Sequence, residues 1–273
     1  MRHAGLLDSP RALGPDGHGC WGYDDLGGDF LEAAVAFLEE GRELGQALMF
    51  VGGPESEAVV RSTEPLASMV ADGTLRVVPF DAVYPDGRRL PHADQWAAYA
   101  ATTEQAMAAG ATGLRVLAEV TSLVRSHGWE GQALWETYAD RRMADWSLSA
   151  LCCFDRGMVA PDDLGRIACA HPVADRRLAD SVPFRLYGDG GAIAITGEID
   201  AFSSHTLRQL LRVDDPVDGD RILDLEGLTF IEHTGVRALH AYAEDVRAQG
   251  RSLTVRGGPR SLQRIAAVLG VAI

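Results

Sequence analysis

The sequence predicts a two-domain α/β protein, and three observations support this fold class. Over roughly the first 155 residues, short apolar strands alternate with amphipathic helices, which is typical of a mostly parallel sheet with helices on both faces. Over residues 183–273, a hairpin precedes a second alternation, which predicts a small mixed β-sheet with helices packed on it. All five tryptophans lie in the first 150 residues, so the two parts also differ in composition.

The first predicted domain spans residues 18–178 and follows a flexible N-terminal arm over 1–17, where Pro, Gly, Asp and His mix without periodicity. Helical spacing of apolar residues predicts a helix over 29–44, which Gly45 ends. The elements after it are, in order, a strand over 46–51, a helix over 56–71, a strand over 75–79, a turn at Tyr84-Pro-Asp-Gly87, a helix over 96–109, a strand over 114–118, a helix over 131–146 and a strand over 148–154.

The second predicted domain spans residues 183–273, after a charged linker over 173–183 that lacks an apolar pattern. Its elements are, in order, strands over 184–187 and 192–199 around a Gly188-Asp-Gly-Gly191 hairpin, a helix over 203–211, a strand over 221–225, a helix over 234–249, a strand over 252–256 and a helix over 259–269. A polar turn leads into the helix at Thr234. Free backbone N–H groups at a helix start suit a capping hydroxyl or a phosphate.

The charge pattern excludes several function classes. The net charge is −14 and no basic run occurs, so direct binding of DNA or RNA is not expected. The chain has no lysine, which excludes Schiff-base chemistry and the usual phosphate-loop lysine. The segment Val51-Gly-Gly-Pro-Glu-Ser56 follows a strand as a phosphate loop would, but Glu55 and Glu57 would repel phosphates. We therefore expect no nucleotide hydrolysis.

The apolar pattern and the cysteines indicate the compartment. No run of about 18 apolar residues occurs, so we expect no membrane span, and the start of the chain does not resemble a signal peptide. The expected location is the cytoplasm. Four cysteines in a chain of 273 residues are then expected to be reduced thiols.

Two motifs in the second domain resemble the STAS family, the fold of anti-sigma-factor antagonists, over residues 183–273. The first is Gly197-Glu-Ile-Asp200 at the end of a strand, and the second is Leu228-Thr-Phe-Ile-Glu-His-Thr-Gly-Val-Arg-Ala-Leu239. The resemblance implies docking on an anti-sigma-factor serine/threonine kinase. It places phosphorylation at Thr234 and partner contacts at Asp200, Glu232, His233 and Gly235.

This sequence departs from the STAS pattern at two of these positions. Glu232 stands where the family usually has Asp, and His233 replaces the usual Ser. Thr234 keeps the acceptor hydroxyl, although it also suits a helix cap, a role worth ~1 kcal/mol. Asp200 is a candidate cap for the helix after it as well as a partner contact.

Dispersed motifs in the first domain resemble the methanogen/methylotroph sensory domain, MEDS, over about residues 14–178. They include His18-Gly-Cys20, Leu117-Ala-Glu119, Leu151-Cys-Cys-Phe-Asp155 and Cys169-Ala-His171. The resemblance implies a RecA-like sheet, recognition of small hydrocarbon-derived ligands and a joined signalling output domain.

The His/Cys pairs allow three interpretations. His18 with Cys20 and Cys169 with His171 could be packed in the core, could line a ligand pocket, or could bind a metal if the two segments converge. Glu119 and Asp155 are further pocket candidates, because both end predicted parallel strands. We assign no metal site and no cofactor. Cys152 and Cys153 are interpreted as buried structural thiols.

The sequence therefore predicts a cytoplasmic signalling regulator that is not an enzyme. A small hydrophobic ligand is the expected input, and a kinase contact switched at Thr234 is the expected output. The main alternative is an unphosphorylated STAS scaffold with a constitutive docking domain. A metal-dependent enzyme that uses His18, Cys20, Cys169 and His171 is a third interpretation, and self-association into a homo-oligomer is left open.

Overall fold

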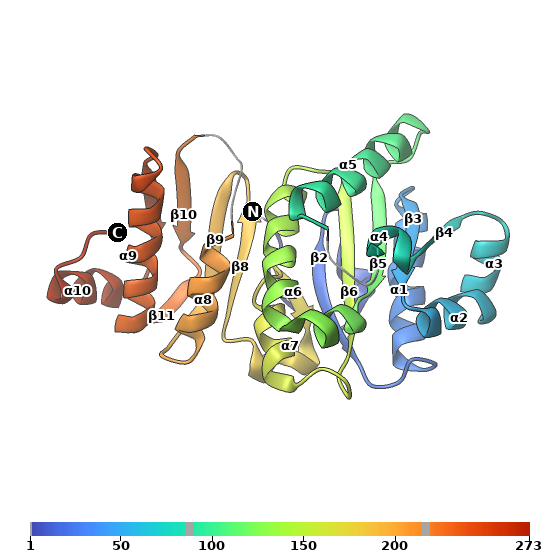
Figure 1. Cartoon of the computed structure of the whole chain (residues 1–273), viewed down its shortest axis with the longest axis horizontal. Coiled ribbons are helices and arrows are strands. Elements are labelled where there is room, and N and C mark those ends of the chain that lie inside the picture. The colour runs from blue at the N-terminus through green and yellow to red at the C-terminus, as the bar shows by residue number, and fades with distance from the viewer. Residues whose placement is uncertain (1, 86–89, 214–218) are drawn as a thin grey trace.

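The computed structural model, which describes residues 2–85, 90–213 and 219–273, contains two β-sheets (Figure 1). The first has seven strands in the order β1-β7-β2-β6-β5-β3-β4, and all neighbouring pairs are parallel. The strands are β1 (Gly5–Leu7), β2 (His18–Tyr23), β3 (Ala47–Gly52), β4 (Leu75–Pro79), β5 (Leu114–Glu119), β6 (Leu148–Asp155) and β7 (Val173–Asp175). The parallel sheet predicted for the first domain is confirmed.

Helices cover both faces of this sheet because successive residues of a buried strand point to opposite sides. Leu151 and Cys153 of β6 pack on the face covered by α1 (Asp29–Glu43), α2 (Pro54–Ser62) and α3 (Leu66–Ala71). Cys152 and Phe154 pack on the face covered by α5 (His92–Ala108), α6 (Thr121–Met143) and α7 (Pro161–Ala168). A short helix, α4 (Phe80–Val83), follows β4.

Several predicted helices have different bounds in the structure. The helix expected over 56–71 is two helices, because Pro65 has no N–H to continue the first one. The helix expected over 131–146 begins ten residues earlier and bends at Gly128, whose φ of 76° suits glycine. The helix α7 was not predicted, and the turn expected at 84–87 lies partly outside the described residues.

The N-terminal segment is not the flexible arm that the sequence predicted. Residues 5–7 form β1, which pairs in parallel with β7, and Leu7 and Leu13 are buried. A 3-10 turn at Pro10–Ala12 connects β1 to β2. The lack of periodicity in this segment arises because three residues are too few to show a strand pattern.

The expected linker over 173–183 is also ordered. Its first residues form β7, which lies between β1 and β2, and a 3-10 helix covers Arg176–Ser181. Asp175 accepts hydrogen bonds from the backbone N–H and the guanidinium of Arg177, so the charged residues here pair within the domain. No free linker separates the two sheets.

The second sheet is mixed, as predicted. Its strand order is β11-β9-β10-β12, and β8 pairs with β9 in the only antiparallel ladder among the described strands. The strands are β8 (Phe184–Asp189), β9 (Ala192–Ile199), β10 (Arg221–Leu225), β11 (Leu228–Ile231) and β12 (Leu253–Gly257), and the helices are α8 (Ser203–Leu211), α9 (His233–Ala248) and α10 (Arg260–Leu269). The short strand β11 was not predicted.

The helix α6 lies between the two sheets, with β8 of the second domain on its outer side (Figure 1). Apolar residues of both domains form one continuous core, from Cys20 and Leu148 through Met143 to Phe184 and Leu186. The two domains are therefore packed as one body.

We predict that Gly188→Ala loosens this packing. A Cβ at Gly188 would lie 2.8 Å from the Cα of Arg141 on α6, so the helix and β8 would have to separate. The expected loss is ~1–3 kcal/mol of unfolding free energy, measured by urea denaturation. Gly53→Ala is the control, because a Cβ there meets nothing within 4 Å. Equal losses in both variants would contradict the close contact.

Candidate functional site

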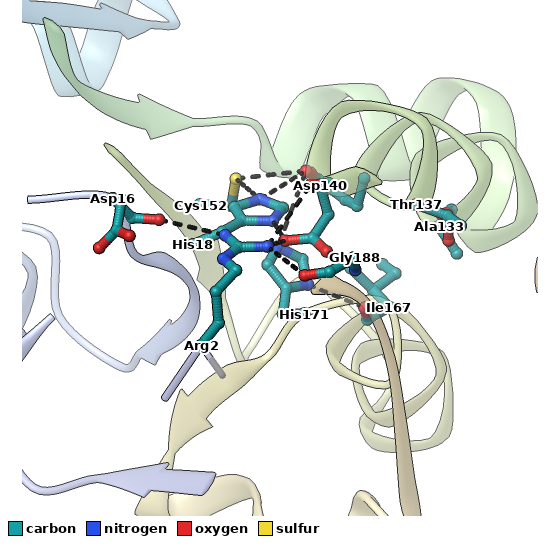
Figure 2. Close-up of polar contacts among 11 residues, drawn as sticks. Arg2, Asp16, His18, Ala133, Thr137, Asp140, Cys152, Ile167, His171 and Gly188 are labelled. Carbon is teal, nitrogen blue, oxygen red and sulfur yellow. Dashed lines mark hydrogen bonds and ion pairs between the residues drawn. The ribbon is translucent and has the colours of Figure 1, made fainter. Parts of the chain in front are cut away.

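Four buried side chains converge between α6 and the first sheet. They are His18 of β2, Glu136 of α6, Cys152 of β6 and His171, which precedes β7. Their donor atoms all lie within 4.8 Å of one another. Figure 2 shows the His18, Cys152 and His171 side chains turned toward a common centre. We call these four residues the His/Cys/Glu cluster.

The fold brings the cluster together from four distant segments. Parallel β2 and β6 are neighbours, with His18 opposite Ala150, so His18 and Cys152 lie on the same face. Gln132, Glu136 and Asp140 follow one another at four-residue spacing on α6, which places them on one side of the helix. The His18 and His171 rings lie 4.2 Å apart, centroid to centroid.

Hydrogen bonds fix the orientation of both imidazoles. His18 Nδ1 lies 3.0 Å from Asp140 Oδ1, and His171 Nδ1 lies 3.0 Å from the carbonyl oxygen of Ile167. A carbonyl or an ionised carboxylate only accepts, so each Nδ1 carries the proton. Both Nε2 atoms are therefore directed at the cluster. His18 Nε2 lies 3.3 Å from Glu136 Oε2, and His171 Nε2 lies 3.7 Å from it.

The buried charges strongly affect the ionisation of the cluster. Burial opposes the charged form of Glu136, but the hydrogen bonds from His18 and Gln132 together with the charges of both histidines outweigh it and hold the pKa of Glu136 at about 2. Burial also opposes charge on His18, yet its bonds to Asp140 and Glu136 raise its pKa. Burial, with the charge of His18, lowers the pKa of His171 to about 4. The cluster thus contains a carboxylate anion beside a neutral imidazole.

A small cavity adjoins the cluster, and His18, Glu136 and Cys152 form its polar end. The rest of the wall is mainly apolar and aromatic, with Tyr84, Trp96, Tyr99, Val116, Trp135 and Ala139 among the lining residues. Its volume is about 40 Å³. Because one water needs about 10–15 Å³ on this measure, the cavity holds a molecule of a few heavy atoms.

Asp140 connects the cluster to the second domain. Besides His18, its carboxylate accepts from the Gly188 N–H of β8 at 2.7 Å and from Arg2 Nη1 at 2.9 Å. Arg2 also donates to the Gly188 carbonyl at 3.1 Å, and its backbone N–H donates to Asp189. Burial opposes the charge of Asp140, but Arg2, His18 and the Gly188 N–H together lower its pKa. One carboxylate therefore joins three segments in the interior.

The turn before α9 forms a second candidate site, at the other end of the second domain. Thr234 is half-buried in the first turn of the helix, and its hydroxyl donates to Glu232 Oε1 at 3.1 Å. Glu232 occupies the N-cap position without a side-chain cap bond, so Thr234 does not cap this helix. His233 is exposed, and its Nδ1 lies 3.5 Å from Glu232 Oε1. Gly235 is buried where a Cβ would meet Ile199 and Ile231.

Asp200 lies beside this turn, because β9 and β11 end together. Ile199 and Ile231 are register partners, and the Glu232 N–H donates to the Ile199 carbonyl at 2.9 Å. The Asp200 carboxylate accepts from the N–H and the hydroxyl of Ser203, both at 2.8 Å, so it does cap the start of α8. These bonds lower the pKa of Asp200. Phe202, next to it, is 91% exposed.

A model of the MEDS family, described as the methanogen/methylotroph, DcmR sensory domain, matches residues 17–172. The chain belongs to the MEDS family. A model described as Mlab, STAS domain, matches residues 183–273, so the protein is a MEDS–STAS fusion. No curated protein matches the chain.

The two families agree with the resemblances carried by the sequence motifs. Within the described residues, no helix is long and apolar enough to cross a membrane. The His/Cys/Glu cluster and its cavity lie in the MEDS domain, and the turn at Thr234 lies in the STAS domain.

Only some of the residues predicted to line a pocket in the MEDS domain lie together in the structure. His18 and His171 meet, as convergence of the two pairs requires, but Cys152 and Glu136 complete the cluster in place of Cys20 and Cys169. Cys20 and Cys169 are buried in the core on the same side of the sheet. Sequence reasoning missed Glu136 because nothing in its helix singled it out, and Cys152 because apolar neighbours indicated a structural thiol.

Glu119 and Asp155 lie apart from the cluster. Glu119 accepts from the hydroxyl of Tyr23 at 3.2 Å and from the Thr121 N–H at 3.1 Å, and burial raises its pKa. Asp155 accepts from the Gly157 N–H in the turn after β6. Both residues end parallel strands, as predicted, but they alternate with Cys152 and therefore belong to the opposite face.

We predict that Asp140→Ala strongly destabilises the protein. The change leaves the Gly188 N–H, His18 and Arg2 without their common acceptor in the interior. Breaking a buried charge pair of this kind costs ~3–5 kcal/mol, measurable as unfolding free energy in urea. Asp145→Ala, at an exposed position just after the same helix, should change it by less than about 0.5 kcal/mol. Similar losses in both variants would show that Asp140 has no special role.

Proposed function

We propose that the protein is a signalling regulator in which the MEDS domain binds a small molecule and the STAS domain docks on an anti-sigma-factor serine/threonine kinase. The observation that carries this proposal is the shared carboxylate of Asp140, which bonds to His18 at the cavity and to Gly188 in the STAS domain. Asp140 is therefore the single residue between the cavity-lining His18 and strand β8 of the STAS domain. We assign no catalytic step to the chain.

The cavity supports the input part of the proposal. An aromatic wall with a few polar groups at one end is the usual construction of a small-molecule site. Gln132 donates to Glu136 at that end, so a ligand hydroxyl or carbonyl would meet both a donor and an acceptor. The volume favours a short amphiphilic molecule with its apolar part against the tryptophans.

The helix α6 supports the transmission part. Glu136 and Asp140 face the cluster, while Arg141 reaches the STAS domain and donates to the carbonyls of Leu210 and Val213 at 3.3 Å. A ligand that shifts or orders this helix would alter contacts on both of its sides. Coupling between sites requires such a shared element, whose arrangement both sites affect.

The surface around Asp200 and Thr234 supports the output part. It combines the exposed aromatic ring of Phe202 with the acidic and imidazole side chains of Glu232 and His233. Aromatic anchors with a polar rim are typical of protein interfaces. STAS domains act through partner proteins. We therefore assign the docking surface to this turn, where the exposed aromatic ring and the polar side chains lie together.

Phosphorylation at Thr234 would act as an electrostatic switch on that surface. The hydroxyl already bonds to Glu232, so a phosphate with −1.5 to −2 charges would lie against a carboxylate. The helix start tolerates the added charge, because free N–H groups and the helix dipole favour anions there. Repulsion and the desolvation of the phosphate would then oppose docking.

We predict a size limit for ligands of the MEDS domain. In a series of alcohols from methanol to 1-butanol, the shortest should change the tryptophan fluorescence and 1-butanol should not, because the cavity admits only about three heavy atoms. All five tryptophans lie in this domain, so the signal reports on it alone. Ala139→Leu, which fills the cavity, should abolish the response, whereas the exposed Ala108→Leu should retain it. A response in Ala139→Leu equal to that of the parent would place the site elsewhere.

We predict that Thr234→Glu weakens binding of the anti-sigma-factor kinase at least about tenfold, while Thr234→Ala binds like the parent. Calorimetry or pull-down with the kinase measures this, and mass spectrometry after incubation with kinase and ATP tests modification of Thr234. Thr254→Glu is the matched control, since Thr254 is exposed on β12 at the opposite edge of the STAS sheet. Equal binding by both Thr234 variants would favour the unphosphorylated scaffold instead.

A further inference from the structure

We propose that the His/Cys/Glu cluster is a binding site for a zinc-class divalent metal, with His18 Nε2, His171 Nε2, Cys152 Sγ and Glu136 Oε2 as ligands. Metal binding here is independent of kinase docking. The ligand set differs from the two His/Cys pairs of the sequence, because two of its members lie on other segments.

Four of the six separations between the donor atoms match the edges of a metal tetrahedron, and all of these atoms lie within 4.8 Å of one another. With Zn–N and Zn–O bonds of about 2.0–2.2 Å and a Zn–S bond of about 2.3 Å, the ligand atoms of a tetrahedral site lie roughly 3.3–3.6 Å apart. The Glu136 Oε2 atom lies 3.3 Å from His18 Nε2, 3.4 Å from Cys152 Sγ and 3.7 Å from His171 Nε2. Cys152 Sγ lies 3.7 Å from His18 Nε2. The Glu136 carboxylate and the His18–Cys152 pair are thus already spaced as metal ligands, and His171 Nε2 is the donor that would move closer.

The orientation of the two imidazoles is the one that metal sites use. Each Nδ1–H donates outward, to the carboxylate of Asp140 or the carbonyl of Ile167, and each Nε2 is left for the centre. A ligating histidine nearly always donates its other N–H to a carboxylate or carbonyl, which fixes the ring. Asp140 thus accepts the hydrogen bond that would orient His18 as a metal ligand.

His171 provides an independent sign of an absent partner. Its Nε2 is buried and has no hydrogen-bond partner among the described residues. Buried polar atoms without partners are rare, and each calls for a reason. A metal at the cluster centre would satisfy this nitrogen directly.

The donor set and the charges favour a borderline metal. Imidazole and thiolate select zinc and related ions, whereas Mg²⁺ and Ca²⁺ prefer oxygen ligands. A divalent ion with the Cys152 thiolate and the Glu136 carboxylate is neutral. Asp140 and Arg2, the next charges outward, neutralise each other in an ion pair at 2.9 Å. The loaded cluster would therefore bury no net charge, which removes the largest cost of placing ions in the interior.

Cobalt substitution tests the site in the full-length protein. After treatment with a chelator, titration with Co²⁺ should give one ion per chain and a thiolate-to-cobalt absorption band, which Zn²⁺ then removes by displacement. Cys152→Ser should lose the band. Cys153→Ser is the matched control, because Cys153 is the next residue of the same strand, equally buried but packed on the other face. It should retain the band.

His171→Gln provides a second variant that keeps every thiol. It should bind Co²⁺ at least tenfold more weakly than the parent, with the fold checked by circular dichroism. Absence of stoichiometric Co²⁺ binding in the parent, or a band that persists in Cys152→Ser, would overturn the proposal. Parent-like affinity in His171→Gln would overturn it as well.

Discussion

The structure depends on the burial of one carboxylate between two domains. Asp140 is fully buried, and an ionised carboxylate in the interior is tolerated only where donors surround it. Those donors come from the cluster, the STAS domain and the N-terminal segment, through His18, Gly188 and Arg2. The carboxylate thus fixes the position of α6, the orientation of the His18 ring and the approach of β8 at the same time. Buried polar contacts of this type can define one arrangement of helix and strand even where apolar side chains at the same positions would give a more stable protein.

The helix α6 shows why part of the fold could be predicted and part could not. The strand β3 is a continuous apolar run, β5 is apolar apart from Arg115 and Glu119, and α1 has a one-sided apolar stripe, so the pattern of apolar residues identified them. In contrast, α6 is buried between two sheets, and its buried residues include Glu136, Asp140 and Arg141. These polar residues lie in the part of α6 that was predicted. The first ten residues were missed because the helix bends at Gly128, so they do not continue the apolar stripe of the residues after the bend. The strand β1 is too short for a pattern to be clear, whereas α7 was missed although Pro161 and two aspartates mark its start.

The candidate site was predictable to the extent that its residues carried a local signal. His18 and His171 were singled out by their pairing with cysteines, and they do meet. The partners that they meet were hidden, because convergence depends on strand order: β7 and β6 both neighbour β2, although they are far from it in the chain. Strand alternation could have shown that Cys152 and Cys153 face opposite sides, but not which side faces the histidines. In the STAS domain two short motifs carried the signal for Asp200 and Thr234, and the structure places these two motifs side by side.

The connection between the two candidate sites follows from where α6 touches the STAS domain. Its hydrogen bonds include one to Gly188, in the β8 end of the hairpin that leads into β9, and one to Leu210, in the last turn of α8. From the hairpin, β9 runs directly to Asp200, and α8 begins just after Asp200. Eight residues of strand span about 26 Å. Both routes from α6 thus end at the same loop, beside Thr234. Under the proposed function, a strand and a helix would transmit a displacement over that length more effectively than a flexible linker. The proposed coupling therefore depends on the ordered segment between the two sheets, which contains β7 and the 3-10 helix Arg176–Ser181, as much as on the residues of either site.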